Sequence, residues 1–286
     1  MDQKIIELYD EYTHAPLDRR VFIRRLTTLA GSAAAASALL PLLENNYAQA
    51  QIVPADDDRL ETSRVTWPGA SGELKGYLAK PKGADKLPAV IVIHENRGLN
   101  PHIEDIVRRM ALEGFLVLGP DMLSPLGGTP ADEDQARTMI GQLNGRQTVD
   151  NLTQTIAYLR GHADSTGKVG AVGFCWGGGM VNALATASPD LAAGVVYYGR
   201  TPPLESVPNI RAKLLLNHAG LDTGINENLP AYEAALKKAN VDYRLHVYPD
   251  VNHAFNNDTN AARYDATAAR LAWDRTTAFL KQNLSS

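Results

Sequence analysis

Residues 169–179 read Val169-Gly-Ala-Val-Gly-Phe-Cys175-Trp-Gly-Gly-Gly179, and this stretch decides the fold. The apolar run 169–174 is typical of a buried strand, and residues 180–187 are compatible with a helix. Glycines two residues before and two residues after Cys175 let the strand and the helix approach closely and expose the side chain between them. The helix then directs its N-terminal amides at the thiol, which favours the thiolate and stabilises an oxyanion. We expect Cys175 to be a nucleophile at a sharp turn.

Two other interpretations of this turn stay open. Free cysteine is among the most often buried residue types, so the first is that Cys175 is a small core residue at a plain tight turn. The second is a dinucleotide site of the GxGxxG type, which the spacing of Gly173, Cys175 and Gly178 disfavours. Residues elsewhere in the chain have to decide between these interpretations.

Strand-like and helix-like patterns alternate on both sides of the turn. We expect strands at 64–67, 74–79, 89–94, 115–118, 169–174, 192–198, 213–216 and 243–248. We expect helices at about 100–113, 132–143, 148–160, 180–187, 229–239 and 260–282. Glycines between the first two strands predict an opening hairpin. The alternation predicts an α/β fold, with a mostly parallel, doubly wound sheet of about eight strands flanked by helices.

Catalytic groups in such a sheet lie at the carboxyl ends of the strands. Asp222 follows the strand 213–216 and His253 follows the strand 243–248, so both are placed to meet Cys175 in the order nucleophile, acid, histidine. His218 is the main alternative as the base, and Asp250 is the alternative acid. Chain order favours Asp222 and His253.

Another central strand, 89–94, is followed by Glu95 and Asn96, where a second oxyanion amide is expected. A carboxylate is unusual at this place, and a solvated loop residue is the other interpretation of Glu95. No H-E-x-x-H pattern follows it, so Glu95 is not expected to bind zinc.

Composition excludes several classes of protein. The chain has 286 residues, of which 44% are apolar and 21% charged, and its net charge is -4, so neither disorder nor nucleic-acid binding is expected. Its one cysteine excludes an internal disulfide and a multi-cysteine metal site. We expect no cofactor and no metal, and the sequence leaves the oligomeric state open.

The N-terminus has the layout of an export signal. Arg19-Arg20 with Phe22 resembles a bacterial twin-arginine signal, the uncharged run 26–43 follows, and Ala48-Gln49-Ala50 ends in small residues. Cleavage after Ala50 and a periplasmic location are expected, with a membrane anchor as the alternative. Residues 1–50 are then a signal or N-terminal extension, and 51–286 form one domain with no stable membrane insertion after cleavage.

From about Arg64 to Phe279 the sequence resembles the dienelactone hydrolase family of α/β-hydrolases. The resemblance rests on the cysteine turn at 173–177, the Glu95 loop, Pro120-Asp121, Asp222, and the run 253–255 of His, Ala and Phe. It implies an α/β-hydrolase fold in which Cys175 is the nucleophile, His253 the base and Asp222 its orienter. It also implies that Glu95 contacts the thiol and helps to form the thiolate, and that the backbone amides of Trp176 and Asn96 form the oxyanion hole.

Substrate binding departs from the family pattern. Type members hold a substrate carboxylate with arginines, one of them four residues after the histidine, where this chain has Asn257. Arg137 matches the other arginine only in a loose alignment. Asn257 and Arg137 are therefore the candidate substrate-binding residues.

These features predict a cysteine-dependent hydrolase of small-molecule lactones or activated esters that acts through a thioester. A thiolate leaves a tetrahedral intermediate more easily than an alkoxide or an amine anion does, so a substrate with a good leaving group is expected. A non-catalytic periplasmic binding protein is the alternative. A thiol redox sensor is a third class, but it would lack a resolving cysteine.

Overall fold

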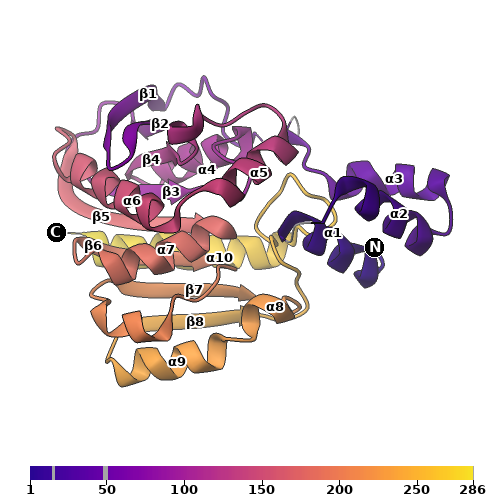
Figure 1. Cartoon of the computed structure of the whole chain (residues 1–286). Coiled ribbons are helices and arrows are strands. Elements are labelled where there is room, and N and C mark those ends of the chain that lie inside the picture. Colours follow the sequence, from indigo (N-terminus) through magenta and orange to yellow (C-terminus); the bar gives the residue numbers. More distant parts are fainter. Residues whose placement is uncertain (15–16, 48–50, 286) are drawn as a thin grey trace.

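The computed structural model describes residues 1–14, 17–47 and 51–285, and it is built around one eight-stranded sheet (Figure 1). The strands are β1 (Leu60–Gly69), β2 (Gly72–Pro81), β3 (Leu87–Ile93), β4 (Leu116–Asp121), β5 (Ser165–Phe174), β6 (Leu191–Tyr197), β7 (Lys213–Ala219) and β8 (Tyr243–Tyr248). Their order is β1-β2-β4-β3-β5-β6-β7-β8. The pairs β1–β2 and β2–β4 are antiparallel, and the other five pairs are parallel. The predicted α/β fold and the opening hairpin are confirmed.

Helices cover both faces of the sheet. They are α4 (Pro101–Leu112), α5 (Glu133–Gln142), α6 (Gly145–Arg160), α7 (Trp176–Ala187), α8 (Thr223–Asn226), α9 (Leu229–Lys238) and α10 (Ala266–Leu284), with the short 3-10 helices η2 (Ser124–Leu126) and η3 (Leu204–Asn209). α4 and α10 pack in one apolar core, while α6, α7 and α9 pack in the other. The predicted helices agree with α4 to α7 and with α9 to within a few residues. The last predicted helix corresponds to α10, which begins six residues later than expected.

The central strand β3 shows why this sequence gives a strand covered on both faces. Val90 and Val92 pack in the core under α4 and α10, whereas Ile91 and Ile93 pack in the core under α6 and α7. Successive side chains of a strand point to opposite faces of the sheet, so a strand between two layers of helices is apolar at every position. All four side chains are fully buried.

Two glycines fix the sharp turn from β5 into α7. A β-carbon on Gly173 would lie 2.1 Å from the carbonyl oxygen of Gly177, and one on Gly177 would lie 2.4 Å from the carbonyl oxygen of Ile93. Such distances are far inside van der Waals contact, so only glycine fits at either position. The turn therefore brings β3, β5 and the start of α7 together at the carboxyl edge of the sheet.

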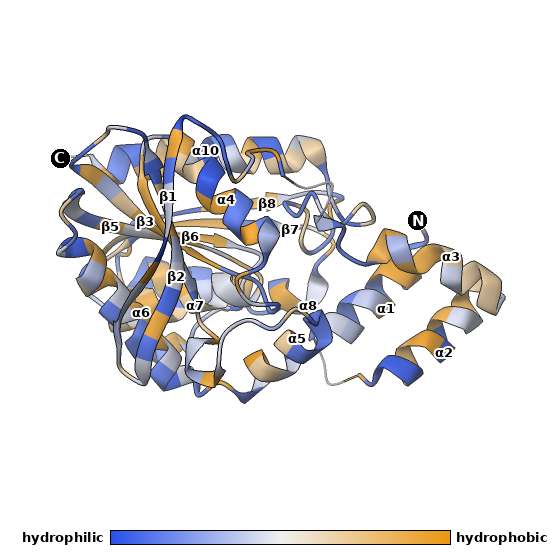
Figure 2. Cartoon of the chain, turned by 90° about the horizontal axis from the view of Figure 1, so that it is seen from above, coloured by the Kyte–Doolittle hydropathy of each residue, from blue (hydrophilic) through white to orange (hydrophobic). Residues whose placement is uncertain are grey.

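Three further helices lie beyond this edge, toward which β7 and β8 point (Figures 1 and 2). They are α1 (Gln3–His14), α2 (Arg19–Ala30) and α3 (Ala33–Leu43), of which α1 is nearest to the sheet. They have an apolar cluster of their own, in which the rings of Tyr12 and Phe22 stack with centroids 4.3 Å apart. We call this group of helices, together with residues 44–47, the N-terminal cap.

The cap contains most of the predicted export signal. No single helix in the described ranges is long and apolar enough to cross a membrane, but α2 and α3 pass that test together as a pair bent by 113°. The bend lies at Gly31, whose φ is 80°, while Pro41 is accommodated inside α3. The expected cleavage after Ala50 falls at residues 48–50, outside the described residues. Export and the division at residue 50 stay predictions.

We predict that Gly173→Ala lowers the free energy of unfolding by at least about 2 kcal/mol, because its β-carbon would overlap the backbone of α7. Gly141→Ala is the matched control, since Gly141 lies in α5 with open space around it. This control should raise the free energy of unfolding by up to about 1 kcal/mol. Urea unfolding followed by circular dichroism measures both. Equal stability of the two variants would contradict the packing described for the turn.

Candidate active site

Cys175 stands between β5 and α7 in a rare backbone conformation, with φ 54° and ψ -115°. Its amide donates to the carbonyl of Tyr197 over 3.0 Å, and its carbonyl accepts from the amide of Gly179 over 3.2 Å. A non-glycine residue at positive φ is strained, and such strain is retained where the surrounding structure enforces it. The turn therefore holds the Cys175 side chain at the carboxyl edge of the sheet, where it is 7% exposed.

The loops after β7 and β8 bring Asp222 and His253 to this edge. His253 Nδ1 lies 2.5 Å from Asp222 Oδ2, so the ring donates to the carboxylate and turns its other nitrogen toward Cys175. The two alternatives from the sequence do not take part. Asp250 is exposed, and His218 is buried with no hydrogen bond from its ring to any described residue. Burial also lowers the pKa of His218 to about 4, so it is a poor base at neutral pH.

The electrostatics of the site favour a thiolate. Burial raises the pKa of the Cys175 thiol, but the imidazoles of His14 and His253 together lower it by more, to about 6. Burial lowers the pKa of His253, but the Cys175 sulfur and the Asp222 carboxylate raise it well above its ordinary value. The opposite shifts of these two pKa values favour transfer of the thiol proton from Cys175 to His253.

His14, the last residue of α1, is a member of the site that sequence reasoning missed. Its Nε2 lies 3.1 Å from Cys175 Sγ, and its Nδ1 lies 2.8 Å from the carbonyl oxygen of Asp10. Its ring meets His253 edge-on, with centroids 4.4 Å apart. The sulfur is thus flanked by two imidazoles. No local signal marks His14, because it stands 161 residues before Cys175 in a segment whose composition indicates export.

The cap is anchored to residues that the sequence assigned to catalysis and substrate binding. Asn96 Nδ2 donates to the carbonyl of Thr13 over 2.6 Å, and Arg137 donates to the carbonyl of Tyr12. Beside them, the buried guanidinium of Arg263 donates to Asp10 over 2.7 Å. Arg137 does lie near the site, but in this arrangement it binds the protein's own backbone.

The space left above the sulfur is very small. A cavity of about 10 Å³ is bounded by Thr13, His14 and Asn45 of the cap, and by Cys175 and His253 below it. A single water needs a cavity of at least about 10–15 Å³. No ester or lactone fits in this arrangement, so the structure represents a closed form in which the cap covers Cys175.

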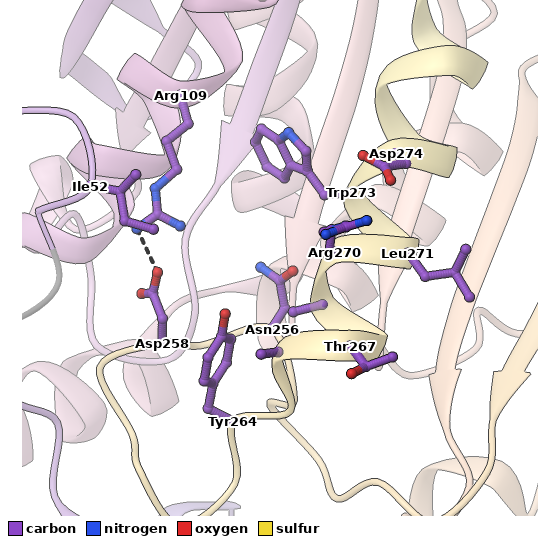
Figure 3. Close-up of a pocket in the computed structure, with 12 residues that line it drawn as sticks. Ile52, Arg109, Asn256, Asp258, Tyr264, Thr267, Arg270, Leu271, Trp273 and Asp274 are labelled. Carbon is purple, nitrogen blue, oxygen red and sulfur yellow. Dashed lines mark ion pairs between the residues drawn. The ribbon is translucent and has the colours of Figure 1, made fainter.

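A much larger hollow lies elsewhere. It has a volume of about 810 Å³ and is lined by residues of α10 and the preceding loop, with Arg109 and Asp258 joined by an ion pair of 2.6 Å (Figure 3). None of the expected catalytic residues lines it. The volume of a cavity therefore does not identify the candidate active site in this protein. The smaller cavity is the better candidate because Cys175 and His253 line it.

Glu95 has a different partner from the one that the family resemblance implied. Its Oε2 accepts from Asn257 Nδ2 over 2.9 Å, and among the described residues it makes no hydrogen bond to Cys175. His14 occupies the place beside the sulfur instead. Asn257 accordingly fixes Glu95 rather than facing open space, and its own Oδ1 accepts from the amide of Thr259 over 3.0 Å.

The expected oxyanion amides belong to the loop after β3 and to the first residue of α7. Asn96 follows β3 in a loop that His94 holds, since His94 Nδ1 donates to the carbonyl of Glu95 over 2.6 Å and Nε2 accepts from the amide of Met122 over 3.2 Å. Trp176 is the first residue of α7, where helix amides have no partner inside the helix. Asn96 lines the same small cavity as Cys175, and the role of both amides stays a prediction.

Tyr198 is a second neighbour that the sequence did not indicate. It follows β6 at φ 38°, and its ring lies against His253 with centroids 4.9 Å apart. Its buried hydroxyl has no hydrogen-bond partner among the described residues. Burial raises the pKa of this hydroxyl well above its ordinary value, so it stays protonated and can donate to a bound group.

One group of side chains in the described residues has the geometry to hold a metal ion. The ligand atoms of His14, Cys175 and His253 all lie within 4.8 Å of one another. Nitrogen and sulfur ligands of this kind suit zinc and similar ions.

Comparison with known proteins identifies the family and agrees with the fold. The model of the dienelactone hydrolase family matches residues 74–284. A protein of Escherichia coli O157:H7, provisionally named carboxymethylenebutenolidase, is 31% identical over 247 residues, which cover 81% of this chain and 90% of that protein. A similarly named protein of Saccharolobus solfataricus is 32% identical and covers 73% of this chain and 94% of its own length.

Solved structures give the same result. A crystal structure of a provisionally named dienelactone hydrolase from Klebsiella pneumoniae has a TM-score of 0.71 at 27% identity, and covers 78% of this chain and 99% of its own. An esterase of Pyrobaculum calidifontis has a TM-score of 0.62 and covers 99% of this chain, including the cap, and 98% of its own. Its identity of 15% makes this a likeness of fold alone. By the family match and the relatives together, the chain belongs to the dienelactone hydrolase family and is a hydrolase.

Proposed function

We propose that the protein hydrolyses lactones or activated carboxylic esters by nucleophilic catalysis at Cys175. The observation that carries the proposal is the arrangement at the strand-to-helix turn, where an imidazole hydrogen-bonded to a half-buried carboxylate faces a thiol whose pKa is about 6. The names of relatives as carboxymethylenebutenolidases support a lactone as the substrate.

In the first half of the reaction, the Cys175 thiolate attacks the substrate carbonyl carbon and the carbonyl oxygen becomes an oxyanion. The backbone amides of Trp176 and Asn96 stabilise this charge. When the intermediate collapses, the carbon–oxygen bond to the leaving group breaks, and the His253 imidazolium gives its proton to the departing oxygen. The products are a thioester on Cys175 and an alcohol or enol, which in a lactone stays attached to the acyl group.

In the second half, neutral His253 removes a proton from water while the water attacks the thioester. The second tetrahedral intermediate expels the Cys175 thiolate and releases the acid. Asp222 holds the imidazole in orientation and stabilises its protonated form in both halves. Since a thiolate leaves more easily than an alkoxide or an amine anion, enol esters should react well and ordinary amides poorly.

We also propose that the protein is exported to the bacterial periplasm, on the basis of Arg19-Arg20, Phe22 and the apolar run after them. The twin-arginine route carries folded proteins, so a cap docked on the folded hydrolase is compatible with export. Fractionation of a bacterium that expresses the full chain tests this. Loss of the periplasmic pool in Arg19→Lys/Arg20→Lys supports export, and an exclusively cytoplasmic wild type contradicts it.

We predict that Cys175→Ala lowers kcat/KM for an activated aryl ester by at least about 1,000-fold, because it removes the atom that attacks the carbonyl. Stopped-flow or steady-state assays measure this, with circular dichroism as the check on folding. Full activity in this variant would end the proposal and leave a non-catalytic role or another nucleophile.

A matched pair of histidine variants tests the choice of base. His253→Gln should lower kcat/KM by at least about 100-fold, because general acid–base catalysis typically contributes that much. His218→Gln should keep most of the activity per folded molecule, since His218 makes no hydrogen bond to the described site residues. The opposite ranking of the two variants would make His218 the base.

Loosening the cap should increase access to the sulfur. Leu26→Ala removes a fully buried side chain from the apolar cluster of the cap, at a cost of about 2–5 kcal/mol to its packing, whereas Leu29 on the same helix is 42% exposed. We predict that Leu26→Ala raises the rate of Cys175 alkylation by iodoacetamide about tenfold or more, and that Leu29→Ala changes it little. Assays near pH 9, above the ordinary thiol pKa of about 8.5, separate access from ionisation. Equal rates would contradict a closed form.

A further inference from the structure

We propose that His14, Cys175 and His253 form a binding site for a soft divalent cation of the zinc class, which joins the cap to the catalytic pair and holds the enzyme closed. The inhibitory consequence rests on the proposed function, whereas binding of the cation does not. The cluster joins two separately packed parts of the chain. His14 is the last residue of α1 in the cap, and the other two residues belong to the part built around the sheet, which we call the hydrolase unit.

The distances suit one ion. Zinc bonds to thiolate sulfur are about 2.3 Å and to imidazole nitrogen about 2.1 Å, so a nitrogen and a sulfur on the same zinc are at most about 4.4 Å apart. His14 Nε2 and Cys175 Sγ already lie 3.1 Å apart, and the whole set lies within 4.8 Å. Side-chain shifts of well under 1 Å bring all three within reach of one ion.

Both rings are oriented as ligand histidines are. The Nδ1 of His14 lies 2.8 Å from the carbonyl of Asp10, and the Nδ1 of His253 lies 2.5 Å from the carboxylate of Asp222. Metal-bound histidines almost always donate their second N–H to a carboxylate or a backbone carbonyl, which fixes the tautomer and the ring direction. Here the Nδ1 atom of each ring is bound to an oxygen, so the Nε2 atom of each ring is free to face the sulfur.

A count of protons gives an independent reason. The sulfur of Cys175 and the two Nε2 atoms that face it share one proton, so wherever this proton lies, one of the two sulfur–nitrogen contacts has no proton between its atoms. His253 Nε2 is buried and makes no hydrogen bond of ordinary geometry to any described residue, although the side chain is only 5% exposed. A cation would accept a lone pair from each of the three atoms, and the proton that they share would pass to solvent.

The charges around the cluster allow a cation. Arg97 and Arg263 line the same cavity, but each guanidinium is paired with a carboxylate, Arg97 with Glu133 and Arg263 with Asp10. Glu95 is a further anion in the lining. A water or Glu95 would supply the fourth ligand that tetrahedral zinc requires.

Binding at this place has two consequences for the enzyme. A metal-bound thiolate has its lone pair engaged, so Cys175 cannot attack a carbonyl, and His253 cannot exchange protons. The same ion also ties His14 to the hydrolase unit and so adds to the contacts that keep the cap in place. Removal of the cation would restore the free thiolate and let the cap open.

The test uses the full chain, freed of metal with a chelator and titrated with Co²⁺ and then Zn²⁺. We expect one equivalent of Co²⁺ with a sulfur-to-cobalt charge-transfer band, which Zn²⁺ then abolishes. His14→Ala should weaken zinc binding about tenfold or more, measured by competition with a chromophoric chelator. His162→Ala is the matched control, since His162 lies outside the cavity after α6, and it should bind as the wild type does.

Absence of the cobalt–sulfur band, or equal zinc affinity of His14→Ala and the wild type, would overturn the inference. His14→Gln, with circular dichroism, checks that any loss is not a loss of folding. Ester hydrolysis by the metal-free wild type is measured separately. Hydrolysis without cation binding supports the proposed function and refutes the cation site. Cation binding without hydrolysis supports the site and refutes the proposed function.

Discussion

The strand-to-helix turn at Cys175 is the constraint on which the rest of the site depends. Gly173 and Gly177 lie so close to neighbouring backbone that no β-carbon fits, and Cys175 between them is held at positive φ. The sulfur is thereby fixed at the carboxyl edge of the sheet, where the loops after β7 and β8 bring Asp222 and His253 to it. Cys175, Asp222 and His253 are far apart in the sequence, but they meet because each follows a strand that ends at this edge of the sheet.

The strands, most of the helices and the meeting of Cys175, Asp222 and His253 could be predicted because each depends on a local pattern. Apolar runs mark the buried strands, and the position of a residue just beyond a strand decides where it lies. His14 could not be predicted in this way. Its contact with Cys175 depends on how α1 packs with α2 and α3 and on the buried pair of Arg263 and Asp10, and no periodicity reports such packing.

The cap contacts two residues that the sequence places in the active site. In the closed form Arg137, which the sequence assigns to substrate binding, donates to the carbonyl of Tyr12, and the side-chain amide of Asn96 donates to the carbonyl of Thr13. A substrate that binds Arg137 has to compete with the carbonyl of Tyr12, so part of its binding energy goes into opening the site. If the segment up to Ala50 is removed after export, His14 leaves with it and this competition ends.

The central claim is that the sulfur of Cys175 carries the acyl group during hydrolysis. The most direct measurement is mass spectrometry of the protein quenched in acid within milliseconds of mixing with an activated ester, followed by peptide mapping. The account predicts one acyl group on the peptide that contains Cys175. An acyl group on a serine or threonine instead, or a burst of released leaving group with no covalent adduct on the protein, would contradict it.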